Sequence, residues 1–293
     1  MDKILVTGCN GQLGSELQDL AKGRKDKEAF LFTDKEHLDI TDRKAVDDYI
    51  RGKGVRLVVN CAAFTAVDKA EGEPELCDLL NHKAPAYLAE AVEGNGGRMV
   101  QVSTDYVFDG LGHVPYKEDC EARPNTVYGA TKLEGEMAVM KACPKAMVVR
   151  TAWLYSTHGN NFVKTMIRLG RERDKLGVVA DQIGTPTYAR DLAKAILAAM
   201  DKGIVPGIYH FSNEGACSWY DFAKAIHRMA GIEDCKVSPL HTEDYPTPAK
   251  RPHYSVLDKT KIKQTYSTDI PWWEDSLREC IGKLVGWLLT TIH

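Results

Sequence analysis

The chain has 293 residues, of which 44% are hydrophobic and 27% are charged, and its formal net charge is -3. This length can bury a large core, and the composition is that of a water-soluble protein with one or two domains. Basic residues are scattered among acids, so neither nucleic acid nor an anionic membrane surface is an expected partner.

Targeting and metal signals are not evident in the sequence. We expect no signal peptide, because a strand begins right after Met1, and the apolar run at residues 284–292 is too short to span a membrane. The eight cysteines include no C-x-x-C pair, and the nine histidines show no metal-ligand spacing. We therefore expect a cytoplasmic protein with reduced thiols and no metal site. The tail around Trp287 either packs internally or forms an interface.

The first predicted elements are a buried strand at residues 3–6 and a helix at residues 13–21, joined by a glycine-rich turn. Gly8, Gly11 and Gly14 form a G-x-x-G-x-x-G pattern there. In a strand–turn–helix unit such glycines permit the tight turn, let the backbone approach a pyrophosphate and let the helix pack on the strand. The helix N-terminus then offers free N–H groups to phosphates. The pattern predicts dinucleotide binding, and an ordinary tight turn is the alternative.

The second strand, residues 30–32, ends close to two side chains that favour different cofactors. Asp34 follows Gly14 by about twenty residues, the spacing at which an acid accepts the adenosine ribose 2′-OH of NADH. Lys35 would instead attract the 2′-phosphate of NADPH. The sequence therefore leaves the cofactor preference open.

A helix at residues 43–51 and a third buried strand at residues 57–60 come next. The segment before this helix, with Asp39 and Ile40, is expected to cap it and to lie near the adenine. The strand leads into small side chains that would let the backbone approach a bound ligand, although simple helix–sheet packing also explains them. These side chains belong to Ala62, Ala63 and Thr65.

A long helical pattern covers residues 77–93, with a predicted kink at Pro85, and a fourth strand covers residues 99–102. Thr104 lies just past the end of this strand. In open α/β sheets, ligands bind at the carboxyl ends of the strands. We therefore expect Thr104 and the glycine turn on the same rim of the sheet.

Tyr128 and Lys132 are candidates for proton transfer. They lie four residues apart in a helix predicted between Pro124 and Pro144, so their side chains share one face. A nearby ammonium stabilises the ionised phenol and lowers its pKa towards the working pH. The Thr104 hydroxyl would hold a substrate carbonyl in place. The alternative for the pair is an aromatic residue on the core face beside a solvated amine.

Strands and helices alternate up to a fifth strand at residues 147–150, which predicts an α/β fold with a Rossmann-type doubly wound parallel sheet. The alternation then loosens, which favours a smaller α/β substrate-binding lobe. We expect residues 1–152 to form the dinucleotide-binding domain and residues 153–293 mainly the lobe, with a return to the first domain at about 185–206. The expected elements of the second half are helices at 161–173, 190–202, 219–230 and 272–292 and strands at 178–179 and 208–211.

Five blocks of the sequence carry a resemblance to a known family. Together with the glycine pattern, Thr104 and the Tyr128-x-x-x-Lys132 spacing, they resemble the dTDP-4-dehydrorhamnose reductases, which belong to the extended short-chain dehydrogenase/reductases. The resemblance spans nearly the whole chain. The blocks are residues 60–71, 103–110, 160–166, 181–187 and 251–258.

The resemblance implies that NADPH or NADH reduces the 4-keto group of dTDP-4-dehydro-L-rhamnose to give dTDP-L-rhamnose. It implies that Tyr128 protonates the sugar oxygen, that Lys132 holds the nicotinamide ribose and that Thr104 hydrogen-bonds the sugar oxygen. The expected cofactor contacts are Gly8, Asn10, Gly11, Gln12, Leu13, Gly14, Asp34, Lys35, Asp39, Ile40, Ala62, Ala63, Thr65, Tyr128 and Lys132. The expected contacts with the nucleotide-sugar substrate are Val67, Thr104, Asp105, Tyr106, Tyr128, Trp153, Asn161 and Arg251.

Two of these expected substrate contacts, Arg251 and Trp153, also have a structural interpretation. Arg251 lies in a loop and could pair with the diphosphate of the substrate, but its spacing fits a solvated arginine equally well. Trp153 could instead be a core aromatic residue. In related 4,6-dehydratases an Asp-Glu pair follows the threonine, whereas here Tyr106 follows Asp105, which disfavours β-elimination.

The resemblance also has implications for the oligomeric state. Some members of the family dimerise through a magnesium ion held by several glutamates, and Glu16 matches one such position. Arg190 stands where a second glutamate would be expected, and a cation there opposes metal binding. We therefore expect a monomer or a weak homodimer without a metal.

Two other functions remain open at this point. The same architecture serves in the regulatory subunit of methionine adenosyltransferase, a non-catalytic relative that binds NADP and a partner enzyme. The chain could also be a reductase or epimerase of another nucleotide sugar. A reductase oxidises the cofactor only with its keto sugar, whereas a regulatory subunit binds the cofactor without turnover.

Overall fold

The computed structural model describes residues 2–290, and the side chains of residues 2–286. Its centre is a six-stranded parallel sheet in the order β10-β5-β4-β3-β1-β2. Short apolar strands suit this sheet, because helices cover both of its faces. The strands are β1 (Lys3–Thr7), β2 (Phe30–Thr33), β3 (Val55–Asn60), β4 (Arg98–Thr104), β5 (Met147–Thr151) and β10 (Gly207–His210).

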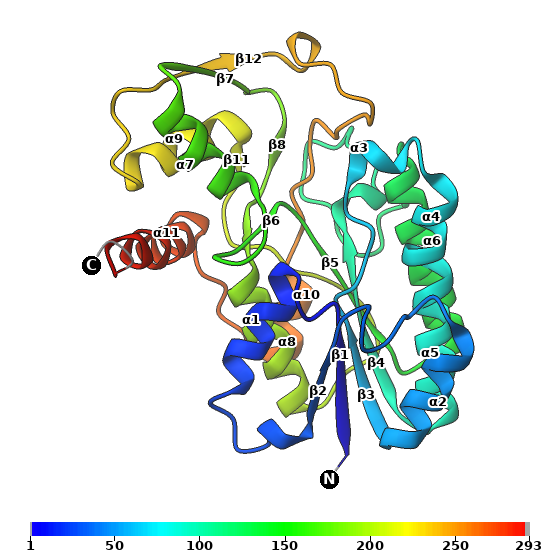
Figure 1. The fold of residues 1–293 in the computed structure, drawn as a ribbon. Coiled ribbons are helices and arrows are strands. Elements are labelled where there is room, and N and C mark those ends of the chain that lie inside the picture. Colours follow the sequence, from blue (N-terminus) through cyan, green and yellow to red (C-terminus); the bar gives the residue numbers. More distant parts are fainter. Residues whose placement is uncertain (1, 291–293) are drawn as a thin grey trace.

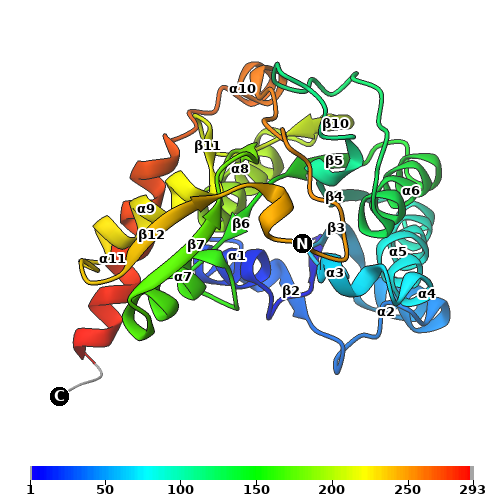
Figure 2. The same cartoon turned by 90° about the horizontal axis from the view of Figure 1, so that it is seen from above.

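Two layers of helices sandwich the sheet, as Figures 1 and 2 show. Neighbouring side chains of a strand point to opposite faces, so Val6 packs in the core under one layer and Leu5 in the core under the other. The first layer is α1 (Gln12–Ala21), α8 (Ala189–Lys202) and α10 (Thr260–Tyr266). The second layer is α2 (Arg43–Lys53), α5 (Ala84–Gly94) and α6 (Val127–Ala142). The predicted doubly wound α/β sheet is therefore confirmed.

A smaller lobe lies above the carboxyl ends of the strands in Figure 1 and has its own core, centred on Tyr155, Tyr188 and Phe222. Its helices are α7 (Phe162–Glu172), α9 (Trp219–Met229) and α11 (Trp273–Thr290). Its paired strands are β7 (Lys175–Val179) with β12 (Lys236–Leu240), β8 (Ile183–Gly184) with β11 (Cys217–Ser218), and β6 (Leu154–Tyr155) with β9 (Thr187–Tyr188). Within residues 2–290, no helix has the length and apolarity needed to cross a bilayer.

The strand expected at residues 208–211 belongs to the central sheet and not to the smaller lobe. It is β10, which pairs with β5 at the edge of the sheet. Tyr209 packs beneath α8 and α10. These tertiary contacts, and not a local sequence pattern, place the strand in the central sheet. The strand β12 was not predicted, because only Val237 of its five residues is buried. The side chain of Trp287 is outside the described residues, so the expected packing of this tail stays a prediction.

The helical pattern at residues 77–93 is divided into pieces. They are α4 (Pro74–Asp78), the π-helical turn η2 (Leu79–Lys83) and α5. Pro85 lies in the first turn of α5, where its missing N–H group is tolerated, so the irregularity precedes the proline. The short helical turns elsewhere are α3 (Val67–Ala70), η1 (Lys27–Ala29), η3 (Asp105–Val107) and η4 (Thr242–Asp244).

A buried ion pair fastens α6 to the central sheet. Nε of Arg150 on β5 donates to Oε1 of Glu136 at 2.9 Å, and Nη2 donates to Oε2 at 2.7 Å. The side chains are only 3% and 2% exposed, and the guanidinium also lies 5.1 Å from the ring centroid of Phe108. Two charges buried at this depth stabilise each other, and either one alone would be strongly destabilising.

We expect Glu136→Ala to lower the free energy of unfolding by roughly 3–5 kcal/mol, because it leaves the Arg150 charge buried without its partner. Urea unfolding followed by circular dichroism measures this loss. The matched control is Glu134→Ala on the same helix, whose side chain is 51% exposed and whose loss should cost less than about 0.5 kcal/mol. Equal losses in the two variants would contradict the assigned role of the pair.

Candidate active site

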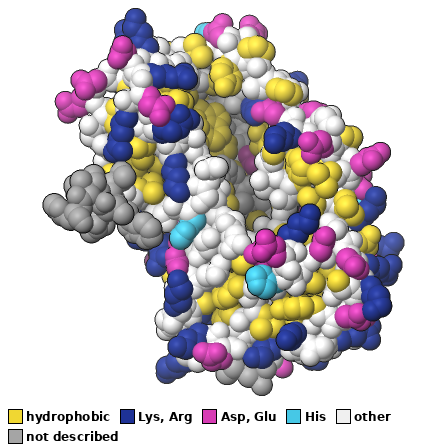
Figure 3. Space-filling model, in the orientation of Figure 1, with side chains coloured by type: hydrophobic (Ala, Val, Ile, Leu, Met, Phe, Trp, Pro, Cys, Tyr) yellow, Lys and Arg dark blue, Asp and Glu magenta, His cyan; other side chains and the backbone are white. Residues whose placement is uncertain are grey.

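A cavity of about 980 Å³ opens between the sheet domain and the smaller lobe. The space-filling view shows it as a hollow between the two parts (Figure 3). Its lining comes from the segments that follow β1, β2, β3, β4 and β5, together with α4, η2, α6, the loop before α7, and Trp219. The cavity is thus at the carboxyl edge of the parallel strands, where open α/β sheets bind ligands.

The glycine turn at one end of the cavity is built for close approach. Gly8 has φ +64°, and a Cβ there would lie 2.7 Å from the backbone nitrogen of Ala62. A Cβ on Gly14 would collide with the carbonyl oxygen of Gly8, so this glycine lets α1 pack on the turn but does not itself line the cavity. The first N–H groups of α1 receive no side-chain cap from Gly11, which leaves them available to an anion.

Asp34 and Lys35 both line the cavity next to the glycine turn. The Asp34 carboxylate accepts a hydrogen bond from Nδ2 of Asn10 at 2.7 Å and lies 2.6 Å from Nδ1 of His37. The hydrogen bond with His37 is the main cause that holds the pKa of Asp34 below its usual range. Asp34 is therefore an ionised acceptor at neutral pH, with Lys35 beside it. The other cofactor candidates on this wall are Gln12, Leu13, Asp39, Ile40, Ala62, Ala63 and Thr65.

Thr104, Tyr128 and Lys132 come together at the same cavity wall. Thr104 ends β4, and its hydroxyl donates to Oδ1 of Asp105 at 3.0 Å. Tyr128 is in the first turn of α6, which begins there because Thr126 caps it by accepting the N–H of Gly129 at 3.0 Å. The three side chains are nearly buried, so each is held in one place by its surroundings.

Burial shifts the pKa values of both Tyr128 and Lys132 away from those of the free side chains. Burial raises the pKa of Tyr128 well above its usual value, although the Thr104 hydroxyl opposes this effect. Burial also lowers the pKa of Lys132 to about 8. Lys132 is not among the groups that lower the phenol pKa, and its Nζ donates to the carbonyl of Val102 at 2.6 Å. Tyr128 therefore carries its proton at neutral pH.

The expected substrate contacts surround this group, with one exception. Val67, Asp105, Tyr106, Trp153 and Asn161 all line the cavity. The Tyr106 ring meets Tyr128 edge to face at 5.5 Å. Burial raises the pKa of Asp105 to about 6. Asn161 is also engaged as the N-cap of α7, where its Oδ1 accepts the N–H of Lys164 at 3.1 Å.

Arg251 is the exception, because it does not line the cavity. Its guanidinium forms two hydrogen bonds of 2.7 Å with the Asp68 carboxylate of α3. The arginine is thus held by an acid, although its side chain stays 26% exposed. The pair joins the loop that carries Arg251 to the start of α3.

Several residues at the site were not foreseen from the sequence. Trp219 lines the cavity and stacks on Trp153 with 3.6 Å between ring centroids. Asn81 of η2 holds the loop after β3 by accepting the N–H of Phe64 at 2.8 Å and donating to its carbonyl at 3.1 Å. These residues lie far in the sequence from the residues that they contact, so the spacing of the sequence motifs does not reveal them. The π-helical turn around Asn81 is the only signal, and it is visible only in the structure.

Glu16, Asp19 and His158 bring three possible ligand atoms within 4.8 Å of one another, but each of these side chains already has a partner in the protein. One carboxylate oxygen of Glu16 accepts the Ser156 hydroxyl at 2.7 Å, and the other accepts Nη1 of Arg190 at 3.1 Å. A guanidinium thus lies where a second acidic ligand would be needed. Asp19 and His158 lie close by, but they bond each other at 2.9 Å.

Comparisons with known proteins agree with this geometry. A sequence model described as the RmlD substrate binding domain matches residues 1–285. A dTDP-4-dehydrorhamnose reductase of Aggregatibacter actinomycetemcomitans is 42% identical over 290 residues, which cover 95% of this chain and 98% of that protein. A Streptomyces antibioticus protein named "Probable dTDP-4,6-dihydroxy-2-methyloxan-3-one 4-ketoreductase" is 41% identical over 284 residues, covering 96% of this chain and 95% of that one.

A solved structure shows the same fold. The crystal structure of dTDP-4-dehydrorhamnose reductase from Bacillus anthracis, in complex with NADP, is 39% identical, covers 97% of this chain and 100% of that chain, and has a TM-score of 0.92. The family model matches nearly the full length, and the relatives are well above 30% identical over almost all of both chains. These matches show that the chain belongs to the dTDP-4-dehydrorhamnose reductase family, which carries the RmlD substrate binding domain.

Proposed function

We propose that this chain reduces the 4-keto group of dTDP-4-dehydro-L-rhamnose to give dTDP-L-rhamnose in the cytoplasm. The observation that carries the proposal is the burial of Thr104, Tyr128 and Lys132 together on a cavity that continues to the glycine turn. NADPH or NADH would bind along that turn and would supply the hydride. The Bacillus anthracis relative, which was solved with NADP, supports this cofactor class.

The chain's own residues would handle the proton and the position of the substrate. Tyr128 carries its proton at neutral pH, because burial raises its pKa. Its phenol would donate that proton to the sugar oxygen as the carbonyl is reduced, since an alkoxide is far more basic than a phenolate. The Thr104 hydroxyl would orient the same oxygen. Lys132 would bind the nicotinamide ribose once its ammonium leaves the Val102 carbonyl.

The sugar subsite favours reduction over elimination. Val67, Tyr106 and Trp153 offer apolar surface that suits the ring face and methyl group of a deoxysugar. Tyr106 stands where a second carboxyl group would be needed for elimination. Arg251 would bind the diphosphate only after releasing Asp68, which makes this the least direct of the assigned contacts.

The assembly that we propose is a monomer or weak homodimer without metal. The bond between Arg190 and Glu16 supports this proposal, because it satisfies the acid internally. Another nucleotide sugar is the second candidate substrate, since a 41% identical relative is named for a different keto sugar. Relatives at this level of identity thus carry different substrate names.

The decisive assay follows oxidation of NADPH and of NADH by absorbance, with dTDP-4-dehydro-L-rhamnose generated in place. We expect rapid oxidation that requires the sugar. Cofactor binding without oxidation would favour a non-catalytic regulatory subunit. Faster oxidation with another keto sugar would favour a reductase of that sugar.

We expect Tyr128→Phe to lower kcat roughly 10²–10⁴-fold, because it removes the general acid. The Kd for NADPH, measured by fluorescence titration, should change little. Tyr87→Phe is the control, because Tyr87 is on α5 and does not line the cavity. Full activity in Tyr128→Phe would show that the proton comes from another group.

We expect kcat/KM for the cofactor to fall as the pH rises through about 8, where the buried Lys132 loses its charge. The sign follows because the ammonium is present below this pKa, while Tyr128 stays protonated throughout. Steady-state rates from about pH 7 to about pH 10 measure the profile. Lys132→Arg should move the decline to higher pH, because a guanidinium keeps its charge. A flat wild-type profile would contradict the assignment.

We expect opposite changes of cofactor preference from two neighbouring substitutions. Lys35→Ala should raise KM for NADPH at least about tenfold and leave KM for NADH unchanged, because only NADPH offers a charged 2′-phosphate. Asp34→Ala should raise KM for NADH instead. Glu36→Ala is the control, because Glu36 is exposed and does not line the cavity. Equal effects on both cofactors would place the adenosine ribose elsewhere.

A further inference from the structure

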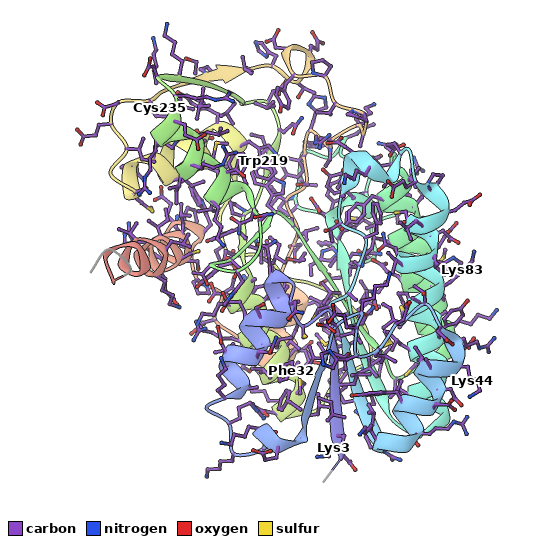
Figure 4. All side chains as sticks on the ribbon, in the orientation of Figure 1. Lys3, Phe32, Lys44, Lys83, Trp219 and Cys235 are labelled. Carbon is purple, nitrogen blue, oxygen red and sulfur yellow. The ribbon has the colours of Figure 1, made fainter. Side chains whose placement is uncertain are left out.

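The smaller lobe contributes two stacked indoles to the cavity. The ring planes of Trp153 and Trp219 are 11° from parallel and their centroids are 3.6 Å apart. Phe162 packs against Trp219 with its ring tilted by 54° and its centroid 4.6 Å away. Figure 4 labels Trp219 within this lobe, below Cys235 and above the sheet domain. Through Phe162, the indole pair is in contact with Phe222 in the core of the lobe.

Trp153 adopts a backbone conformation that is unfavourable for a bulky residue. Its φ is +48°, and Ser267 is the only other non-glycine residue with positive φ in the described part of the chain. Such a conformation persists only where the surroundings hold it. The Trp153 carbonyl accepts the N–H of Thr187 at 3.1 Å, and the next two residues pair with β9. Strain held at a ligand cavity points to a functional reason for the orientation of this indole.

The Trp153 ring packs against both Trp219 and Gly184. A Cβ on Gly184 would lie 2.6 Å from Cε2 of the Trp153 indole, so the ring uses space that only glycine leaves. Gly184 is in β8, which pairs with β11, and Trp219 follows β11 directly. Ser218 fixes Trp219 through a capping box, because its hydroxyl accepts the N–H of Asp221 at 3.0 Å. Both contacts of the Trp153 ring thus come from one hydrogen-bonded unit.

We propose that Trp219 is a positioning residue that holds the Trp153 indole at the sugar subsite and thereby sets how tightly the sugar binds. The inference rests on the proposed function, because it places a deoxysugar against Trp153. A flat ring buries the C–H face and methyl group of such a sugar best when its orientation is fixed before binding. Without the second indole, Trp153 would have space to rotate and its strained backbone could relax.

The test is a set of substitutions assayed with the keto sugar and NADPH. Trp219→Ala should raise KM for the sugar about tenfold, with kcat within about threefold and KM for NADPH unchanged. Trp219→Phe should restore KM to within about threefold of the wild type, because a phenyl ring still stacks. Trp153→Ala combined with Trp219→Ala should have no higher KM than Trp153→Ala alone, because Trp219 acts through Trp153.

Trp273→Phe is the matched control, because this indole is buried in the same lobe but does not line the cavity. It should leave both KM values unchanged. An unchanged KM in Trp219→Ala, or additive effects in the double variant, would overturn the positioning role. A fall in melting temperature with equal changes in both KM values would also overturn it, since the role would then be only structural. If the wild type fails to oxidise NADPH with the sugar, the proposed function itself fails, which is a distinct outcome.

Discussion

The buried charge of Arg150 has to be matched, and its partner sets the position of the helix that carries the catalytic candidates. Glu136 meets this guanidinium in the core, where neither group could be left alone. Lys132 and Tyr128 lie one and two turns earlier on the same helix, so their place follows from the register of that bond. Thr126 then starts the helix at the rim, with its hydroxyl on the N–H of Gly129. One ion pair in the core and one cap at the rim thus define where the phenol points.

The cavity belongs to both parts of the molecule, because the chain after β5 crosses from one to the other. The sheet domain supplies the glycine turn and the Tyr128 group, while the lobe supplies Trp153 and Trp219. Ser156 lies in the segment that crosses from the sheet domain to the lobe, and its hydroxyl donates to the Glu16 carboxylate of α1 at 2.7 Å. The same carboxylate holds Arg190 of α8, so one acid ties the lobe, the glycine-turn helix and the returning helix together. Each oxygen of this carboxylate thus has a partner within the protein.

Local patterns in the sequence were sufficient for the elements that such patterns control. The strand–glycine–helix unit, the helix that Asp42 caps and the helix that begins before Tyr128 are found where they were expected. The strand at β10 was expected, but the sheet that it joins was not, because a short apolar strand does not reveal its partners. The ion pair of Arg251 with Asp68 could not be foreseen, because it depends on how a distant loop folds back.

The sequence by itself determined the doubly wound sheet, the glycine turn and the grouping of Thr104, Tyr128 and Lys132 at one rim. These follow from periodicity, from glycine spacing and from the rule that parallel strands present their carboxyl ends on one edge. Only the tertiary structure decided the protonation of Tyr128, the engagement of Lys132 with Val102 and the stacking of Trp219 on Trp153. Burial and contacts between segments far apart in the chain control these features, and neither is encoded in local spacing.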